Sequence, residues 1–247
     1  MPDGRRIAYR HHPGTGPVSG PASGPASGPA ILFLPGYMSD MAGSKATALW
    51  DWAVGSGREC LLLDYSGCGE SPGLFADGTL TRWCEEAVAL AETHLAGRMV
   101  IVGSSMGGWL MLLAARALGA RVAGLVGIAA APDFTQWGYD DGERQTLERG
   151  ETLLRANPYG PEPTPTHAAF WADGQAHRQL EGEIALDCPV RLLHGTADAE
   201  VPPAISLQLA ERLRSSDVQV TLVKQGDHRL SRPGDIDLLL RTVESIA

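Results

Sequence analysis

The chain has 247 residues, of which 44% are hydrophobic and 20% are charged, a composition typical of a single globular domain with a large core. Its formal net charge of −9 argues against nucleic acid or an anionic membrane as the main partner, because both attract basic surfaces. The scattered cysteines exclude a disulfide framework and a metal site of the CxxC type, so we expect them to be reduced and packed: Cys60, Cys68, Cys84 and Cys188.

Membrane and export signals are not recognisable in the sequence. No uninterrupted apolar run reaches about 18 residues, the length that a membrane-spanning helix needs, and the basic residues near Met1 precede no apolar segment of a signal peptide. Together with reduced cysteines, this predicts a cytoplasmic protein. Arginine far outnumbers lysine, which occurs only at Lys45 and Lys224, and this bias is typical of GC-rich bacterial genomes.

The first predicted elements are a short strand and a long loop. The strand covers residues 7–10. Residues 16–30 then repeat a Ser-Gly-Pro-Ala unit, in which proline removes backbone donors and glycine raises the entropic cost of ordering. We therefore expect a flexible surface loop that joins two strands, in preference to a tract that binds a partner protein.

From residue 31 onward, short apolar segments without polar alternation alternate with segments of helical spacing. The predicted strands cover residues 31–34, 60–64, 99–102, 122–129, 190–194 and 218–223. The predicted helices cover residues 42–54, 80–95, 107–118, 202–213 and 236–246. Buried strands separated by helices predict an α/β fold, in which a mostly parallel, doubly wound sheet carries helices on both faces.

Residues 133–187 interrupt this alternation. They contain two segments with helical spacing, residues 143–154 and 167–180, joined by the proline-rich residues 157–165. An insertion that follows the carboxyl end of a strand lies over the ligand crevice of an open α/β sheet. We therefore predict one domain over residues 1–247, with a short helical lid at residues 133–187.

Two segments match the G-x-S-x-G pattern of a serine nucleophile, one centred on Ser71 and one on Ser105. Such a nucleophile needs a buried strand before it, a helix after it and small residues on both sides of the strained serine. The segment around Ser105 has all three, whereas Ser71 lies in a loop next to Pro72. We therefore predict that Ser105 is the nucleophile and that Ser71 is structural.

A serine hydroxyl needs a histidine to take its proton and a carboxylate to orient that histidine. His228 follows the strand of residues 218–223, and Asp198 follows the strand of residues 190–194. Since the carboxyl ends of parallel strands meet at one edge of the sheet, His228 is the predicted base and Asp198 the predicted acid. Asp133, near the end of an earlier strand, is the alternative acid. Other histidines are expected to be packed or solvated rings: His94, His167 and His177.

Acyl transfer also requires N–H donors for the oxyanion of the tetrahedral intermediate. The backbone N–H of Met106, at the start of the helix behind Ser105, is one predicted donor. The turn after residues 31–34 places the N–H of Tyr37 as the second, although an ordinary strand-ending turn would have the same sequence. The residues predicted to form an apolar acyl site, each of which could instead belong to the core, are Met38, Trp109, Tyr139, Phe170 and Trp171.

Longer segments make the sequence resemble the α/β-hydrolase family, and within it the enzymes described as mitochondrial palmitoyl-protein thioesterase and acyl-glucuronide esterase, with their bacterial relatives. These segments are FLPGY at 33–37, LDYSG at 63–67, GSSMGGWLML at 103–112, CPVRLLHG at 188–195 and DHR at 227–229. The resemblance implies hydrolysis of S-acyl thioesters or carboxylic esters without a cofactor, with Ser105, Asp198 and His228 as nucleophile, acid and base. The Ser-Gly-Pro-Ala loop and the predicted lid depart from the family pattern.

The predicted function is that of a serine hydrolase acting on a small-molecule ester or acyl thioester, or on an S-acylated protein, with no cofactor and no metal. The same fold also supports a C–C bond hydrolase, a peptidase, a perhydrolase or a ligand-binding protein that is not an enzyme. A haloalkane dehalogenase is disfavoured because its nucleophile is an aspartate, where this chain has Ser105. Nothing in the sequence indicates the oligomeric state.

Overall fold

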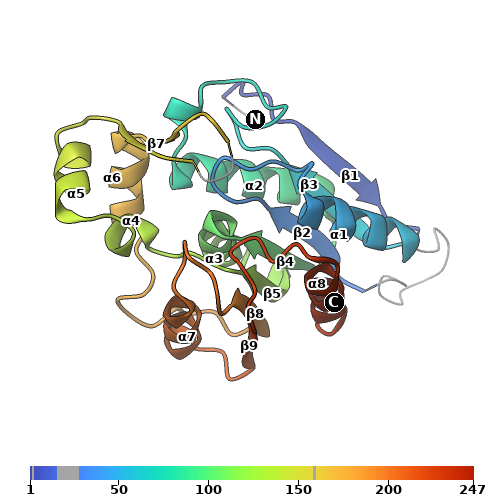
Figure 1. Cartoon of the computed structure of the whole chain (residues 1–247). Helices are drawn as coiled ribbons and strands as arrows, with labels where there is room; N and C mark the ends of the chain where they lie inside the picture. Colours follow the sequence, from blue (N-terminus) through green and yellow to red (C-terminus); the bar gives the residue numbers. More distant parts are fainter. Residues whose placement is uncertain (2, 16–27, 158–159) are drawn as a thin grey trace.

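The computed structural model describes residues 1, 3–15, 28–157 and 160–247, which form an α/β fold around a seven-stranded sheet (Figure 1). The strands are β1 Tyr9–Pro13, β2 Ala30–Leu34, β3 Glu59–Leu63, β4 Met99–Ser104, β5 Val122–Ile128, β8 Val190–Gly195 and β9 Val218–Val223. Their order is β1-β3-β2-β4-β5-β8-β9, and all neighbours are parallel except β1 and β3. The predicted mostly parallel sheet is confirmed.

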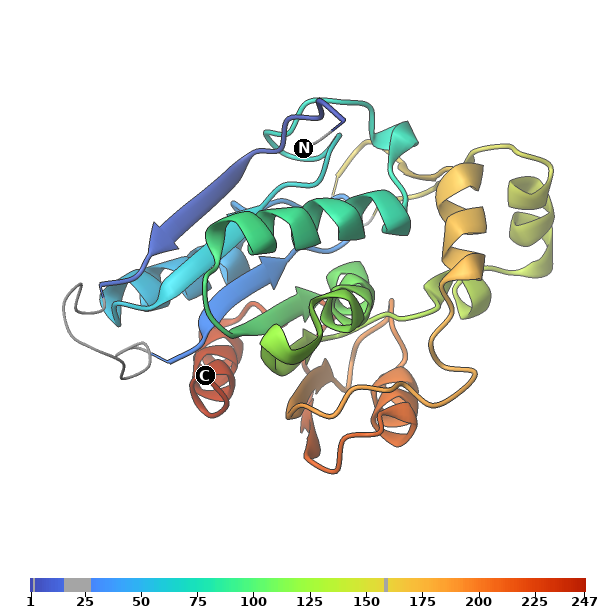
Figure 2. The same cartoon turned by 180° about the vertical axis from the view of Figure 1, so that it is seen from behind.

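Helices cover both faces of this sheet (Figure 2). They are α1 Ser44–Gly55, α2 Leu80–His94, α3 Met106–Leu118, α7 Pro203–Arg212 and α8 Pro233–Glu244, with short 3₁₀ turns η1 Phe75–Asp77 and η2 Gly119–Arg121. Successive side chains of a strand point to opposite faces. In β2, Leu32 and Leu34 therefore pack in one core with α2, α3 and α7, whereas Ile31 and Phe33 pack in a second core with α1 and α8.

The predicted elements of this framework lie within a few residues of the observed ones. The first strand begins at Tyr9 rather than at residue 7 and continues to Pro13. The predicted flexible loop falls, for residues 16–27, outside the described residues. Among the described residues, no helix is long and apolar enough to cross a membrane, and the cytoplasmic location stays a prediction.

The inserted residues 133–187 differ in part from the predicted pair of helices. They form α4 Phe134–Trp137, α5 Asp141–Glu148, β6 Leu153–Arg155, β7 Thr164–Thr166 and α6 Ala168–Ala176. The predicted helix over residues 143–154 is wrong beyond Glu148, because Gly150 has a φ of 82°, a left-handed conformation that a helix cannot continue through. Leu153–Arg155 instead forms a strand that pairs with Thr164–Thr166. Most of this second strand lies in the proline-rich residues 157–165, which we predicted to be a link without regular structure.

Candidate active site

The backbone at Ser105 makes a sharp turn between β4 and α3. Its φ of 54° and ψ of −119° are unusual for a residue with a side chain, and they hold the serine at the junction between the strand and the helix. The turn is possible because glycines stand where the backbone segments touch: a Cβ on Gly103 would collide with the carbonyl of Gly107, and a Cβ on Gly107 with that of Leu34. The local geometry is that of the predicted nucleophile turn.

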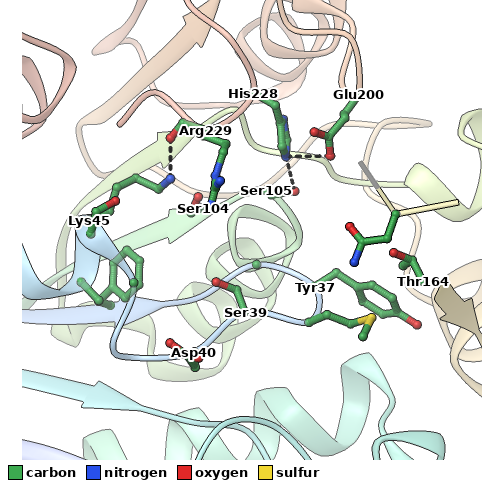
Figure 3. A pocket seen from close by; sticks show the side chains of 17 residues that line it. Tyr37, Ser39, Asp40, Lys45, Ser104, Ser105, Thr164, Glu200, His228 and Arg229 are labelled. Atoms are coloured by element: carbon green, nitrogen blue, oxygen red, sulfur yellow. Dashed lines mark hydrogen bonds and ion pairs between the residues drawn. The ribbon is translucent and has the colours of Figure 1, made fainter. Parts of the chain in front are cut away.

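The predicted nucleophile, base and acid lie next to one another at the carboxyl edge of the sheet, and Figure 3 shows the nucleophile and the base. Ser105 follows β4, Asp198 follows β8 and His228 follows β9. His228 Nε2 lies 3.0 Å from Ser105 Oγ, and His228 Nδ1 lies 2.9 Å from Asp198 Oδ2. The side chain of Asp198 is fully buried while that of His228 is 13% exposed, so the histidine reaches the cavity and the carboxylate is shielded from water.

The Asp198 carboxylate is held on both oxygens. Oδ1 accepts the backbone N–H groups of Glu200 and Val201, each at 2.9 Å, whereas Oδ2 faces His228 and also lies 3.3 Å from Nε2 of the buried His194. Burial alone disfavours the charged carboxylate, but the hydrogen bonds from His194 and His228 outweigh it and hold the pKa of Asp198 well below its usual range. Asp198 is thus an ionised partner for the histidine at neutral pH.

The alternative acid, Asp133, has a different set of contacts. It is buried, and its two carboxylate oxygens accept the backbone N–H groups of Gln179 and Leu180, each at 2.7 Å. Burial raises the pKa of Asp133 despite these two bonds. Its oxygens tie the end of the insertion to the residues after β5, and we assign it this structural role.

The second G-x-S-x-G serine also has structural contacts. Ser71 Oγ donates to the carbonyl of Asp64 at 2.6 Å and accepts the N–H of Ala8 at 2.8 Å, which joins the loop after β3 to the chain before β1. The rings of the other histidines are packed or hydrogen-bonded away from Ser105. His94 lies 4.5 Å from the ring of Tyr9, His167 bonds Thr152 and His177 bonds Thr81.

The residues that carry the two predicted oxyanion donors both lie close to Ser105 in the chain or in space. Met106 is the first residue of α3, where a backbone N–H has no acceptor within its own helix. The turn after β2 approaches from the other side, since a Cβ built on Gly36 would lie 3.3 Å from Ser105 Cβ and 3.9 Å from its Oγ. Tyr37 directly follows Gly36 and lines the cavity that contains Ser105, and its N–H stays a predicted donor.

A cavity of about 380 Å³ opens above Ser105. Its wall is formed by the turn after β2, the start of α1, the end of β4, the loops that carry His228 and Glu200, and part of the insertion (Figure 3). The described lining residues are Phe33, Gly36, Tyr37, Met38, Ser39, Asp40, Gly43, Ser44, Lys45, Ala46, Ser104, Ser105, Asn157, Thr164, Glu200, His228 and Arg229. The wall thus combines apolar side chains with polar and charged ones.

The five residues predicted to bind an acyl group are not all at this cavity. Met38 lines it and is 49% exposed. The other four are absent from the described lining residues: Trp109 belongs to α3, and the other three belong to the insertion. The ring centroids of Phe170 and Tyr37 lie 4.9 Å apart, and the Nε1–H of Trp109 donates to the carbonyl of His177. Tyr139 and Trp171 hydrogen-bond Thr166 and Thr135 within the insertion.

Comparisons with known proteins identify the family of the chain. The sequence matches the profile of the prolyl oligopeptidase family (Peptidase_S9) over residues 80–243. The mitochondrial palmitoyl-protein thioesterase ABHD10 of Mus musculus is 39% identical over 222 residues, which cover 87% of this chain and 74% of that protein. The chain belongs to the α/β-hydrolase family.

Two solved structures are similar to this chain over nearly its whole length. A putative hydrolase from Agrobacterium vitis S4 has a TM-score of 0.85 at 38% identity and covers 98% of this chain and 99% of its own. The mouse alpha/beta hydrolase domain-containing protein 10 has a TM-score of 0.84 at 35% identity and covers 97% of this chain and 92% of its own. At this coverage the likeness includes residues 133–187 as well as the sheet.

Three polar residues beside the predicted triad of this α/β-hydrolase are not singled out by the sequence. His194 contacts Asp198, Glu200 Oε2 lies 3.8 Å from His228 Nε2, and Lys45 lines the cavity from α1. The only signals are that Glu200 follows the predicted acid by two residues and that Lys45 is one of two lysines. Neither signal is specific, because Glu200 meets His228, and Lys45 meets the loop of His228, only after folding.

Metal and disulfide chemistry have no assembled site in the described part of this hydrolase. Among residues 1, 3–15, 28–157 and 160–247, no three His, Cys, Asp or Glu side chains group in a way that could hold a metal ion. All four cysteines are free, and burial raises the pKa of each thiol. The thiols are thus protonated and unreactive at neutral pH.

Proposed function

We propose that the protein is a serine hydrolase that cleaves carboxylic esters or S-acyl thioesters through an acyl-enzyme on Ser105. The observation that carries the proposal is the continuous contact from Ser105 Oγ to His228 and from His228 to Asp198, at 3.0 and 2.9 Å, at the mouth of a cavity. This spacing suits a serine whose proton is removed as it attacks a carbonyl carbon.

In the first half of the reaction, Ser105 Oγ attacks the acyl carbonyl while His228 Nε2 takes the hydroxyl proton. The positive imidazole is stabilised by the ionised Asp198, which accepts a hydrogen bond from Nδ1–H and keeps the ring in place. The N–H groups of Met106 and Tyr37 stabilise the oxyanion. His228 then returns its proton to the departing alcohol or thiol, which leaves an ester on Ser105.

In the second half, water enters the cavity and His228 takes one of its protons as the oxygen attacks the acyl-enzyme. The same two N–H groups stabilise the second oxyanion, and the proton returns to Ser105 Oγ as the acid leaves. Each step uses side chains and backbone groups of this chain alone. Thioesters and oxygen esters pass through the same intermediate, so we propose both as substrate classes.

The relatives support the thioester class. ABHD10 of mouse is named a palmitoyl-protein thioesterase, and it is 39% identical to this chain. We therefore include S-acylated proteins among the proposed substrates.

We further infer that residues 133–187 act as a short lid. Thr164 and Asn157 line the cavity from this segment, and the hydroxyl of Tyr37 donates to the carbonyl of Pro165 at 2.9 Å. The insertion is thereby joined to the turn that carries one proposed oxyanion donor. Substrates would pass between this segment and Ser105.

The test is hydrolysis of matched oxygen esters and thioesters with acyl chains of about 2 to about 16 carbons, by the wild type and by Ser105→Ala. Loss of the nucleophile is expected to lower kcat by on the order of 10⁶. Ser71→Ala is the matched control, because it removes the serine of the other G-x-S-x-G segment. It is expected to cost about 1–3 kcal/mol of stability and to leave kcat within a few-fold. A folded wild type that hydrolyses none of the panel would contradict the proposal.

Amide hydrolysis is the second candidate, because the matching family profile is named for prolyl oligopeptidase. Adding a peptide p-nitroanilide to the panel separates the two candidates. An ester hydrolase is expected to cleave the matched ester far faster than the anilide, whereas comparable rates on both would favour a peptidase.

A further inference from the structure

Lys45 reaches from α1 across the cavity wall to the loop that carries the proposed base. It is the second residue of α1 and lines the same cavity as Ser105. Its Nζ donates to the backbone carbonyl of Arg229 at 2.5 Å, and Figure 3 shows this bond beside the cavity. Arg229 directly follows His228, so the lysine is bonded to the chain one residue away from the base.

The loop after β9 is bonded on the N-terminal side of His228 to the loop after β8, since the N–H of Gln225 donates to Thr196 Oγ1 and the N–H of Ala197 donates to the carbonyl of Gly226, each at 2.9 Å. It begins and ends with residues in the left-handed region, Gln225 at φ 58° and Leu230 at φ 42°. Within the loop, Asp227 Oδ1 accepts the N–H of Leu230 at 3.0 Å. These bonds join the loop to itself and to the neighbouring loop after β8, whereas Lys45 joins it to α1, at the residue directly after His228.

The surroundings of Lys45 make its charge sensitive to pH near neutrality. Burial and the positive Arg229 lower the pKa of Lys45 to about 8, and Asp227 and Asp235 oppose this shift only in part. Asp235 is itself bound by Arg232, which weakens its effect on the lysine. The other charged groups that line the same cavity are Asp40, Glu200 and His228. A charged ammonium donates a stronger hydrogen bond than a neutral amine.

We propose that Lys45 is a positioning residue that holds His228 in line with Ser105 through its bond to the Arg229 carbonyl. This inference rests on the proposed serine-hydrolase function. A correctly placed imidazole is needed at every proton transfer, and a displacement of about 1 Å can cost on the order of 10²-fold in rate. The proton on Lys45 then sets how firmly the loop is held.

The test is the rate at which a fluorophosphonate probe labels Ser105, measured from about pH 6.5 to about pH 9.5. Labelling depends on activation of the serine by His228 but not on the identity of the natural substrate. The variants are Lys45→Met, which removes the donor, and Lys45→Arg, which keeps a donor that stays charged over this range. Lys224→Met is the matched control, because it removes the other lysine, which is exposed and does not line the cavity.

For the wild type we expect labelling to slow as the pH rises through about 8, where Lys45 loses its proton. Lys45→Met is expected to label about tenfold more slowly at pH 7 and without this decline. Lys45→Arg is expected to stay within a few-fold of the wild type at pH 7 and to lack the decline as well. Lys224→Met should match the wild type throughout.

Two results would overturn the role of Lys45: labelling of Lys45→Met within twofold of the wild type at pH 7, or an alkaline decline that persists in Lys45→Arg. Thermal unfolding of each variant shows whether it is folded, and Lys45→Arg decides the question if Lys45→Met is not. A folded wild type that the probe does not label at all would instead contradict the proposed function.

Discussion

Replacing Asp198 by asparagine tests the proposed acid with the smallest change in shape. The carboxylate accepts two backbone N–H groups at 2.9 Å on Oδ1 and the His228 ring at 2.9 Å on Oδ2. An amide has only one oxygen, so its NH₂ group must face either the backbone donors or the Nδ1–H of His228. If the amide nitrogen faces the histidine, Nε2 becomes the protonated nitrogen and cannot accept the proton of Ser105.

The expected loss of kcat follows from two changes: His228 adopts the wrong tautomer, and the negative charge of Asp198 is removed. We expect Asp198→Asn to lower kcat by on the order of 10⁴, or about 5 kcal/mol of transition-state stabilisation. The variant should also lose about 1–3 kcal/mol of folding stability, because a charged acceptor of buried hydrogen bonds is removed.

Asp133→Asn provides the matched control, since it makes the same chemical change at the other buried acid near a strand end. The carboxylate oxygens of Asp133 accept the N–H groups of Gln179 and Leu180. We expect a loss of about 1–3 kcal/mol of stability and a kcat within several-fold of the wild type. The assay is kcat for a short-chain p-nitrophenyl ester, with urea unfolding of each variant. A large loss of kcat in folded Asp133→Asn, together with near-normal kcat in Asp198→Asn, would refute the assignment.

Three further predictions concern the turn, the insertion and the pH dependence of stability. Gly107→Ala should lower both kcat and the unfolding midpoint, because the new Cβ would collide with the carbonyl of Leu34, whereas Gly97→Ala, with no atom within 4 Å of its Cβ, should match the wild type. Phe170→Ala should cost about 3–5 kcal/mol in urea unfolding, because its ring is 1% exposed, and a loss below about 1 kcal/mol would contradict tight packing of the insertion. Folding lowers the pKa of Asp198, so its charge adds stability above about pH 4, and this stability is lost as the pH falls through the folded-state pKa. The difference in thermal midpoint between the wild type and Asp198→Asn should therefore become smaller in acid. A difference that stays constant would count against this linkage.

The sequence predicts the framework well because the responsible signals are local. Apolar segments such as residues 99–102 specify buried strands by themselves, and the glycines around Ser105 allow a turn that few other residues permit. Prediction fails where a local pattern is overridden by one residue or by a distant partner. Helical spacing continues past Glu148, but Gly150 ends the helix and the next residues pair with Thr164–Thr166.

The candidate site likewise has features that are predictable from neighbouring residues and features that depend on folding. The sequence by itself determined the α/β class and the proposed nucleophile, because a strand, a strained serine and a helix are neighbours in the chain. Asp133 and Asp198 both follow strand ends, and the sequence favoured Asp198; the tertiary structure adds that Asp198 faces His228, whereas Asp133 faces the N–H groups of Gln179 and Leu180. The position of Lys45 beside the loop of His228 likewise required folding, because its bond to Arg229 joins residues 184 positions apart.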